Sequence, residues 1–189
     1  MHTERFKYFN LEVQEIVTYL MEHLQIKTMP LGNDIIPKKE LYGCYTREEI
    51  LTLVGRQTAY RKMQGSETGV FNLPEHNATL LFVTLNKSEA DFSPSTQYND
   101  YLINENFFHW QSQNTDSHHN NGGRRYTMQS ETDNRIILFV REEKKDGYGN
   151  TCPFHCFGLV DYVSSHGDFP MYVTWKLEEP AMPYNVKAL

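Results

Sequence analysis

The hydrophobic positions near the start of the chain repeat with the period of a helix. Between residues 13 and 24 the apolar side chains follow the i, i+3, i+4, i+7 spacing, which predicts an amphipathic helix over about 11–24. A second helix is predicted at 46–54, because Thr46 and Glu49 form a capping box ahead of an apolar face and Gly55 follows the last turn. Neither helix carries a motif that indicates catalysis or ligand binding, so we interpret both as elements that cover the core.

The pattern changes to that of β-strands after residue 68. Short runs rich in β-branched and aromatic residues alternate with turn-forming residues. Asp146-Gly147 predicts the tip of a hairpin over 144–150, and the polar stretch 112–123 predicts an exposed loop. The predicted strands are 69–72, 79–85, 107–111, 135–141, 157–163 and 171–177.

These elements predict an α+β fold with N-terminal helices. The sheet is expected to be curved, mostly antiparallel and of at least five strands, either open or closed into a β-barrel. No repeat or linker divides the chain, which is therefore interpreted as a single domain over 1–189. Within it, 1–45 would hold the first helix and a connection, and 46–189 a helix followed by the barrel.

Composition and charge limit the classes of protein to which this chain can belong. The chain has 189 residues and a formal net charge of −6. It has no apolar run near the roughly 20 residues of a membrane span and no signal-peptide pattern at its start. We therefore expect a cytoplasmic protein with no membrane partner. Proteins that bind nucleic acid mainly by neutralising phosphates are basic, so an acidic chain would have to bind nucleic acid through local contacts.

The sequence offers few candidates for metal binding or catalysis. The stretch Cys152–Cys156 could supply three metal ligands, but a fourth could come only from the adjacent His118-His119. Glu142 and Lys144 have the Glu-x-Lys spacing found on a catalytic strand of some nucleases. They fall in the charged hairpin, however, where a solvent-exposed tip is the alternative interpretation. Nucleophile-elbow, phosphate-loop and zinc-protease motifs are absent from the sequence. We therefore predict no cofactor, no metal and no catalytic residue.

The stretch 86–113 is unusual because it is long, polar and full of large rings. Carboxylates stand among the rings as Asp91 and Asp100. Rings that stack on a flat ligand, next to a carboxylate that accepts from its exocyclic amine, are the chemistry that holds a nucleobase. The alternative is that the rings plug the end of the sheet and that Asp91 caps a turn at Ser93-Pro94. Both interpretations stay open on the residues alone.

Several motifs also resemble a known family. They are Tyr45–Ile50, Leu81–Pro94, Tyr98–Tyr101, Phe108–Gln113 and Ile137–Arg141. Together they resemble a C-terminal domain of unknown function found in large bacterial proteins, behind a phospholipase-D-type nuclease and a superfamily-2 helicase. The resemblance runs from about residue 10 to about residue 180. Helicase and nuclease motifs are absent from this sequence, so the chain is interpreted as a separated domain or a free-standing relative.

The resemblance implies a function and a partner. Some proteins of that kind are type IV restriction enzymes, which cut DNA that contains 5-methylcytosine or 5-hydroxymethylcytosine. It implies that this domain reads the modified base, with a fold like the SET- and RING-associated (SRA) barrel that flips the base into an aromatic pocket. The expected partners are modified DNA and the nuclease–helicase domains of the same protein. Two alternatives remain, namely an autoinhibitory module that docks on a helicase and an RNA-binding module of the PUA type.

Site residues follow from this interpretation. The expected base-binding residues come from the ring-rich stretch, and the expected DNA-backbone contacts are basic side chains near turns. The base-binding set is Asp91, Phe92, Ser93, Tyr98, Asp100, Tyr101 and Trp110, and the backbone set is Lys87, Arg124, Arg125 and Arg141.

Overall fold

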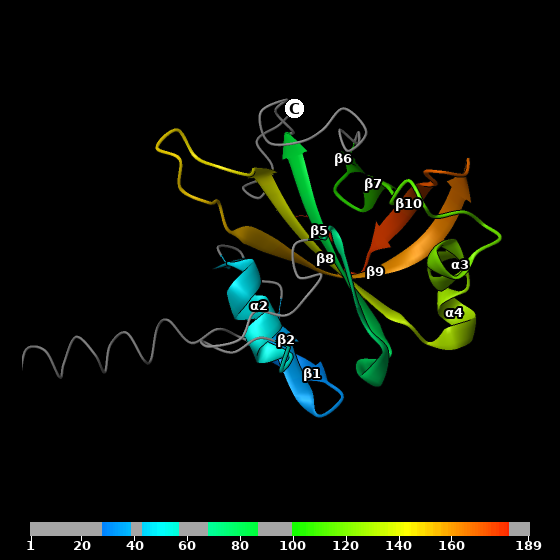
Figure 1. Ribbon diagram of the computed structural model, residues 1–189, viewed down its shortest axis with the longest axis horizontal. Helices are drawn as coiled ribbons and strands as arrows, with labels where there is room; N and C mark the ends of the chain where they lie inside the picture. Colours follow the sequence, from blue (N-terminus) through cyan, green and yellow to red (C-terminus); the bar gives the residue numbers. More distant parts are fainter. Residues whose placement is uncertain (1–27, 39–42, 57–67, 87–99, 182–189) are drawn as a thin grey trace, which may run out of the picture.

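A computed structural model describes residues 28–38, 43–56, 68–86 and 100–181 of the chain (Figure 1). The helix predicted at 11–24 lies outside these residues. The helix predicted at 46–54 is confirmed as α2 (Arg47–Leu53). Its capping box forms as the sequence indicates, because the Glu49 backbone N–H donates to the Thr46 hydroxyl at 3.2 Å and the Thr46 backbone N–H donates to the Glu49 carboxylate at 2.7 Å.

All six predicted strands are confirmed, and further strands accompany them. A small hairpin pairs β1 (Thr28–Leu31) with β2 (Asp34–Pro37). Among the described residues, the main sheet holds eight strands, and the short helical segments are η1 (Pro74–His76), α3 (Asn121–Thr127) and α4 (Gln129–Thr132). The strands of the main sheet are β3 (Cys44–Tyr45), β4 (Val70–Leu73), β5 (Ala78–Asn86), β6 (Tyr101–Asn104), β7 (Phe107–Gln111), β8 (Arg135–Glu143), β9 (Phe154–His166) and β10 (Tyr172–Leu177).

The sheet is mostly antiparallel but does not close. Its strand order is β4-β5-β8-β9-β10-β7-β6, and β3 pairs with β9. The barrel form of the prediction is therefore wrong, because in the described part of the chain β4 and β6 end the sheet without pairing to each other. The central pair β5–β8 is parallel, with Leu81 opposite Leu138. The crossover between these two strands carries β6, β7, α3 and α4.

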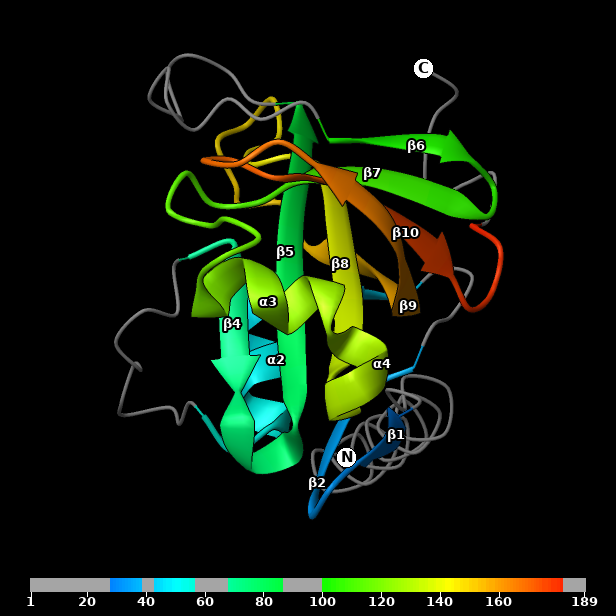
Figure 2. The same cartoon turned by 90° about the vertical axis from the view of Figure 1, so that its right-hand side faces the viewer.

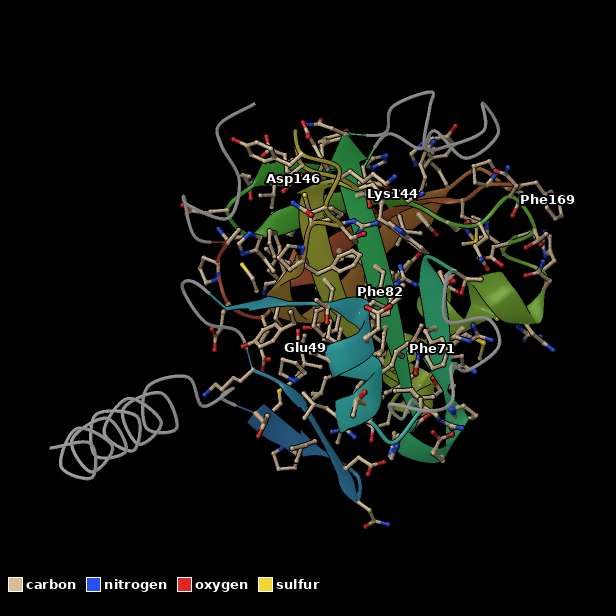
Figure 3. The ribbon with its side chains drawn as sticks, turned by 60° about the vertical axis from the view of Figure 1, so that its left-hand side comes forward. Glu49, Phe71, Phe82, Lys144, Asp146 and Phe169 are labelled. Carbon is tan, nitrogen blue, oxygen red and sulfur yellow. The ribbon has the colours of Figure 1, made fainter. Side chains whose placement is uncertain are left out.

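Two hydrophobic cores lie on opposite faces of the sheet. The first packs α2 and the β1–β2 hairpin against β4, β5 and β8, and Figure 3 shows Phe71 and Phe82 on the side of the sheet where α2 lies. The second lies inside the curve of the sheet, where Tyr126 of α3 packs against residues of β7 and β10. Figure 2 shows α3 and α4 on this side of the sheet. Alternate residues of β5 and β8 serve the two cores because side chains of a strand point to opposite faces.

The expectation of an exposed polar loop over 112–123 is wrong for much of that stretch. Ser112, Asp116 and Ser117 are buried, and α3 begins at Asn121. Polar groups can be buried here because they are hydrogen-bonded; the Asp116 carboxylate, for example, accepts from the Tyr126 hydroxyl at 3.1 Å. Gly123 permits the tight packing of this segment, since a Cβ there would collide with the Ser117 carbonyl.

No helix among the described residues has the length and apolar character needed to cross a bilayer.

Candidate functional site

A row of four rings crosses four adjacent strands of the sheet. Tyr101 of β6 lies 4.7 Å from His109 of β7, His109 lies 6.0 Å from Tyr172 of β10, and Tyr172 lies 5.0 Å from His166 of β9, measured between ring centroids. The interplanar angles are 30°, 22° and 10°, so each ring lies within 30° of parallel to its neighbour. We call these four side chains the ring row, and the face of β6, β7, β9 and β10 that carries them the outer face.

Strand register explains why these rings meet. Tyr101 is paired directly with His109, and Tyr172 directly with His166. His109 is paired with Thr174, so Tyr172 is its diagonal neighbour two residues along β10. Directly opposed and diagonal neighbours on one face of a sheet are close enough for large rings to touch. The ring row is thus a product of register between strands that are far apart in the sequence.

The ring row is accessible to solvent, and burial favours the neutral form of one of its histidines. Tyr101 is 42% exposed and His166 is also exposed, whereas His109 and Tyr172 are half-buried. Burial lowers the pKa of His109, and the nearby His166 lowers it further, while the Asp100 carboxylate acts in the opposite direction. Imidazole and phenol rings are flat and polarisable, and those at the ends of the row can stack on further rings.

Asp100 lies at the edge of the ring row. It is buried, and its carboxylate accepts a hydrogen bond from the backbone N–H of Gln111 at 2.8 Å. This bond ties the start of β6 to the end of β7, so that Asp100 positions Tyr101 beside His109. Asp100 and Tyr101 are therefore the two predicted base-binding residues that the structure brings together.

Trp110 is a core residue rather than part of the outer face. It is 4% exposed and packs edge-to-face on Tyr126 at 5.0 Å, with Trp175 at 6.1 Å. Because it is the neighbour of His109 in β7, it points to the opposite side of the sheet. The structure therefore separates Trp110 from the ring row.

The predicted backbone contacts are also dispersed. The Arg141 guanidinium is buried, where it donates to the Thr84 hydroxyl at 2.9 Å and lies over the Phe154 ring at 4.3 Å, so it serves the first core. Arg124 is exposed and Arg125 half-buried, but both belong to α3, which packs against the inner face. The remaining predicted site residues lie outside the described part of the chain: Lys87, Asp91, Phe92, Ser93 and Tyr98.

One basic side chain that the sequence did not single out lies on the outer face. Lys176 of β10 is exposed and alternates to the same side as Tyr172 and Thr174. Its cross-strand partner in β9 is Asp161. Strand alternation alone could have placed Lys176 with Tyr172, but not with residues of β6 or β7.

The end of the β9–β10 hairpin holds a second polar cluster. His118 Nε2 lies 2.7 Å from Ser165 Oγ, and His118 Nδ1 lies 3.0 Å from the Asp168 carboxylate. The Tyr162 hydroxyl lies 2.8 Å from the same Ser165 Oγ. We call these four residues the Ser165 cluster. No local motif signals it, because His118 approaches Ser165 only when the loop before α3 folds against the hairpin, where Phe169 N–H donates to the Asp116 carbonyl.

The cysteine and histidine residues considered for a metal do not gather into one group. Cys156 is buried and its thiol donates to the Pro37 carbonyl at 3.3 Å, whereas His155 lies against Cys44 with 3.3 Å between Nδ1 and Sγ. Burial raises the pKa of the Cys44 thiol, which disfavours its thiolate. Within the described ranges, no group of three or more His, Cys, Asp or Glu side chains could hold a metal ion.

Comparison with known families identifies one match. Residues 40–185 match a domain of unknown function, DUF3427. This chain belongs to the DUF3427 family. The match covers the whole main sheet, including both the ring row and the Ser165 cluster of this DUF3427 domain. Among curated proteins, none matches the chain.

Proposed function

We propose that this DUF3427 domain reads modified cytosine in DNA and that its ring row is the surface on which bases stack. The ring row carries the proposal, since it offers four partly exposed rings on the face of a β-sheet, each within 30° of parallel to its neighbour. Sheets with exposed rings bind nucleic acid in this way, because every base has a flat face that stacks on an aromatic ring.

The geometry favours stacking at the Tyr101 end of the ring row. Tyr101 is the more accessible of the two phenols in the ring row, with 42% of its surface exposed, and it lies on β6 at the end of the strand order. Asp100 holds it in place through the Gln111 backbone. Each base stacked on an aromatic ring contributes about 1–3 kcal/mol. This is less than the roughly 4 kcal/mol of a millimolar complex, so we expect more than one base to contact the ring row.

The charge of the chain sets the expected salt dependence. With a formal net charge of −6, the protein gains little binding free energy from the DNA phosphates. Lys176 is a basic residue that alternates onto the outer face beside the ring row. A protein that neutralises few phosphates shows a shallow dependence of affinity on salt. We therefore expect base contacts, rather than backbone contacts, to dominate the binding free energy.

The preference for modified cytosine rests on the family resemblance of the sequence. A 5-methyl group adds at most about 0.8 kcal/mol when it is buried, by the value for one methylene. Selectivity above a few-fold therefore also requires that other bases be rejected. Nuclease and helicase domains of the same protein are the proposed partners that would act on the recognised DNA.

Fluorescence anisotropy tests the proposal directly. Labelled duplexes with cytosine, 5-methylcytosine or 5-hydroxymethylcytosine at one position are titrated at low and moderate salt, together with the matched single strands of DNA and RNA. We expect tighter binding to a modified strand than to its unmodified match. Equal affinity for all DNA strands would contradict the modified-base proposal, and a preference for the RNA strand would favour an RNA-binding module instead.

A pair of tyrosine variants tests the ring row. Tyr101→Ala should weaken binding by about 1–3 kcal/mol. Tyr148→Ala is the matched control, because Tyr148 is 94% exposed at the tip of the β8–β9 hairpin, which Figure 1 shows far from β6, β7 and β10. An unchanged affinity in the Tyr101 variant, or an equal loss in both, would contradict a role for the ring row.

A further inference from the structure

When the His118 ring is neutral, hydrogen-bond chemistry sets the direction of each bond in the Ser165 cluster. The backbone N–H of His118 donates to the Asp168 carboxylate at 2.7 Å, and the His118 ring approaches the same oxygen at 3.0 Å. These bonds hold the pKa of Asp168 below its usual range, so the carboxylate is ionised and can only accept. His118 Nδ1 must therefore carry the proton.

The rest of the chain of bonds follows from that proton. A neutral imidazole protonated at Nδ1 has a bare Nε2, which can only accept. The Ser165 hydroxyl, 2.7 Å from Nε2, must then donate to it. Because that hydroxyl has a single hydrogen, its oxygen accepts from the Tyr162 hydroxyl at 2.8 Å. The serine is thus oriented with its proton toward a base and its lone pairs toward a second donor.

We propose that Ser165, His118 and Asp168 form a nucleophile–base–carboxylate triad that transfers the acyl group of a carboxylic ester. The nucleophile lies within hydrogen-bond reach of its base, and a third group orients the base, which is the arrangement that activates a serine hydroxyl. The proposal is independent of nucleic-acid binding, because Ser165 alternates to the inner side of β9 while its neighbour His166 belongs to the ring row.

The cluster is open enough to meet a small ester. The side chains of His118 and Asp168 are 32% and 36% exposed, and Ser165 is half-buried. The cluster lies at the turn between β9 and β10, and Figure 3 shows the turn residue Phe169 at the edge of the molecule. Buried triads exclude water from the reaction, so a half-exposed one should favour small, reactive esters.

The proposed steps balance as an ordinary ester hydrolysis. Ser165 Oγ bonds to the carbonyl carbon of the ester while its proton passes to His118 Nε2. The carbon–oxygen bond to the alcohol then breaks, and His118 gives its proton to the departing alcohol. Water next attacks the acyl-serine with His118 as its base, which releases the carboxylic acid and restores Ser165.

Two probes test the proposal on the whole 189-residue chain. The first is a fluorophosphonate, which bonds to an activated serine through phosphorus and loses fluoride; tandem mass spectrometry locates the adduct. The second is p-nitrophenyl acetate, whose release of p-nitrophenol reports the acyl step. We expect the adduct on Ser165 and a release of p-nitrophenol faster than in buffer alone. An adduct spread over other serines, or release no faster than in buffer, would overturn the proposal.

Variants separate the chemistry from a structural role. Ser165→Ala should abolish the adduct, and His118→Ala should slow both reactions by about 10²- to 10⁴-fold, the usual contribution of a general base. Ser164→Ala is the matched control, because Ser164 is exposed on the opposite side of β9 and should react like the wild type. Site mapping on the wild-type chain decides the question even if a variant fails to fold. Retention of both reactions in folded Ser165→Ala protein would overturn the proposal.

Discussion

Strands β7 and β10 present aromatic rings on both faces, and the two faces use them in opposite ways. On the inner face, Tyr126 meets Trp110 at 83° and Trp175 at 87°, and all three side chains are buried. On the outer face, Tyr172 lies at 22° to His109 and at 10° to His166, with part of the surface of each ring exposed. Edge-to-face packing fills the inner core, whereas the stacked rings of the outer face leave part of their surface exposed to solvent.

The role of an aromatic ring in this fold therefore depends on which element covers it rather than on its residue type. Trp110 and His109 are neighbours in β7, yet only Trp110 is covered by α3. The same face that carries the ring row is covered by α2 and the β1–β2 hairpin where it reaches β4, β5 and β8. One continuous face of the sheet is therefore core at one end and candidate binding surface at the other.

Removing an inner ring should have the largest effect. Trp175→Ala should lower the free energy of unfolding by about 3–5 kcal/mol, because it leaves a cavity where a fully buried indole packs on Trp110 and Tyr126. Urea unfolding followed by circular dichroism measures the loss. Tyr172→Ala, in the same strand but on the outer face, is the comparison. Similar losses in the two variants would contradict the division of the rings into core and surface.

Removing an outer ring should act on binding rather than on stability. Tyr172→Ala should weaken binding of a modified oligonucleotide by about 1–3 kcal/mol, which corresponds to about 5- to 150-fold in the dissociation constant. Tyr172→Phe keeps the ring and should bind within a few-fold of the wild type. If the alanine variant retains full affinity while it stays folded, Tyr172 has no part in recognition.

The sequence predicted the elements better than it predicted their environment. The capping box located α2, and the alternating apolar runs located six strands, since both signals are local. The parallel pairing of β5 with β8 and the open edge of the sheet depend on contacts between distant segments, which local patterns do not carry. The stretch 112–123 looked exposed because it is polar, but burial of Asp116 follows from its bond to Tyr126.

The candidate site was predicted only in part for the same reason. Asp100 and Tyr101 were predicted from their residue types. Tyr101 belongs to the ring row, and Asp100 lies at its edge. Alternation places Trp110 and His109 on opposite faces of β7, but only the position of α3 decides which face is buried. His109, Tyr172 and His166 join Tyr101 through strand pairing between distant segments, so composition gave no sign of them.

Replacing the buried Asp116 should change the stability of the fold by a smaller amount, which depends on pH. Burial is the main cause that raises the pKa of Asp116, although the Tyr126 hydroxyl acts in the opposite direction. Because the folded state has the higher pKa, the contribution of Asp116 to stability is full at low pH and is lost as pH rises through that pKa. Asp116→Asn should remove this loss, so its stability relative to wild type should increase between pH 4 and pH 7 in thermal melts.

A control isolates that effect from the other carboxylates. Asp133→Asn changes an exposed carboxyl at the end of α4, where asparagine also suits the left-handed backbone at φ 53°. The difference between the two variants over the same pH range isolates the effect of burial at Asp116. A wild-type-like pH profile in the Asp116 variant would show that the charge of this carboxyl costs nothing in the folded state.

The smallest expected effect belongs to the arginines of α3. Arg124 and Arg125 lie on the helix that covers the inner face, away from the ring row. The double change Arg124→Ala and Arg125→Ala should therefore alter oligonucleotide affinity by less than about threefold and leave the salt dependence almost unchanged. Lys176→Ala on the outer face provides the contrast and should reduce the salt slope by about 1. A steep loss in the double variant would move the phosphate contacts to α3.

The most direct test of the ring row is a map of where a modified oligonucleotide binds. Titration of the ¹⁵N- and ¹³C-labelled chain with a short strand that contains one 5-methylcytosine, followed by nuclear magnetic resonance, reports every contacted ring and amide. We predict the largest shifts at the ring protons of Tyr101, His109 and Tyr172, with little change at Trp110 or at the Tyr148 hairpin tip. Shifts that cluster on α3 or on the hairpin tip, with the ring row unchanged, would contradict the proposal that bases stack there.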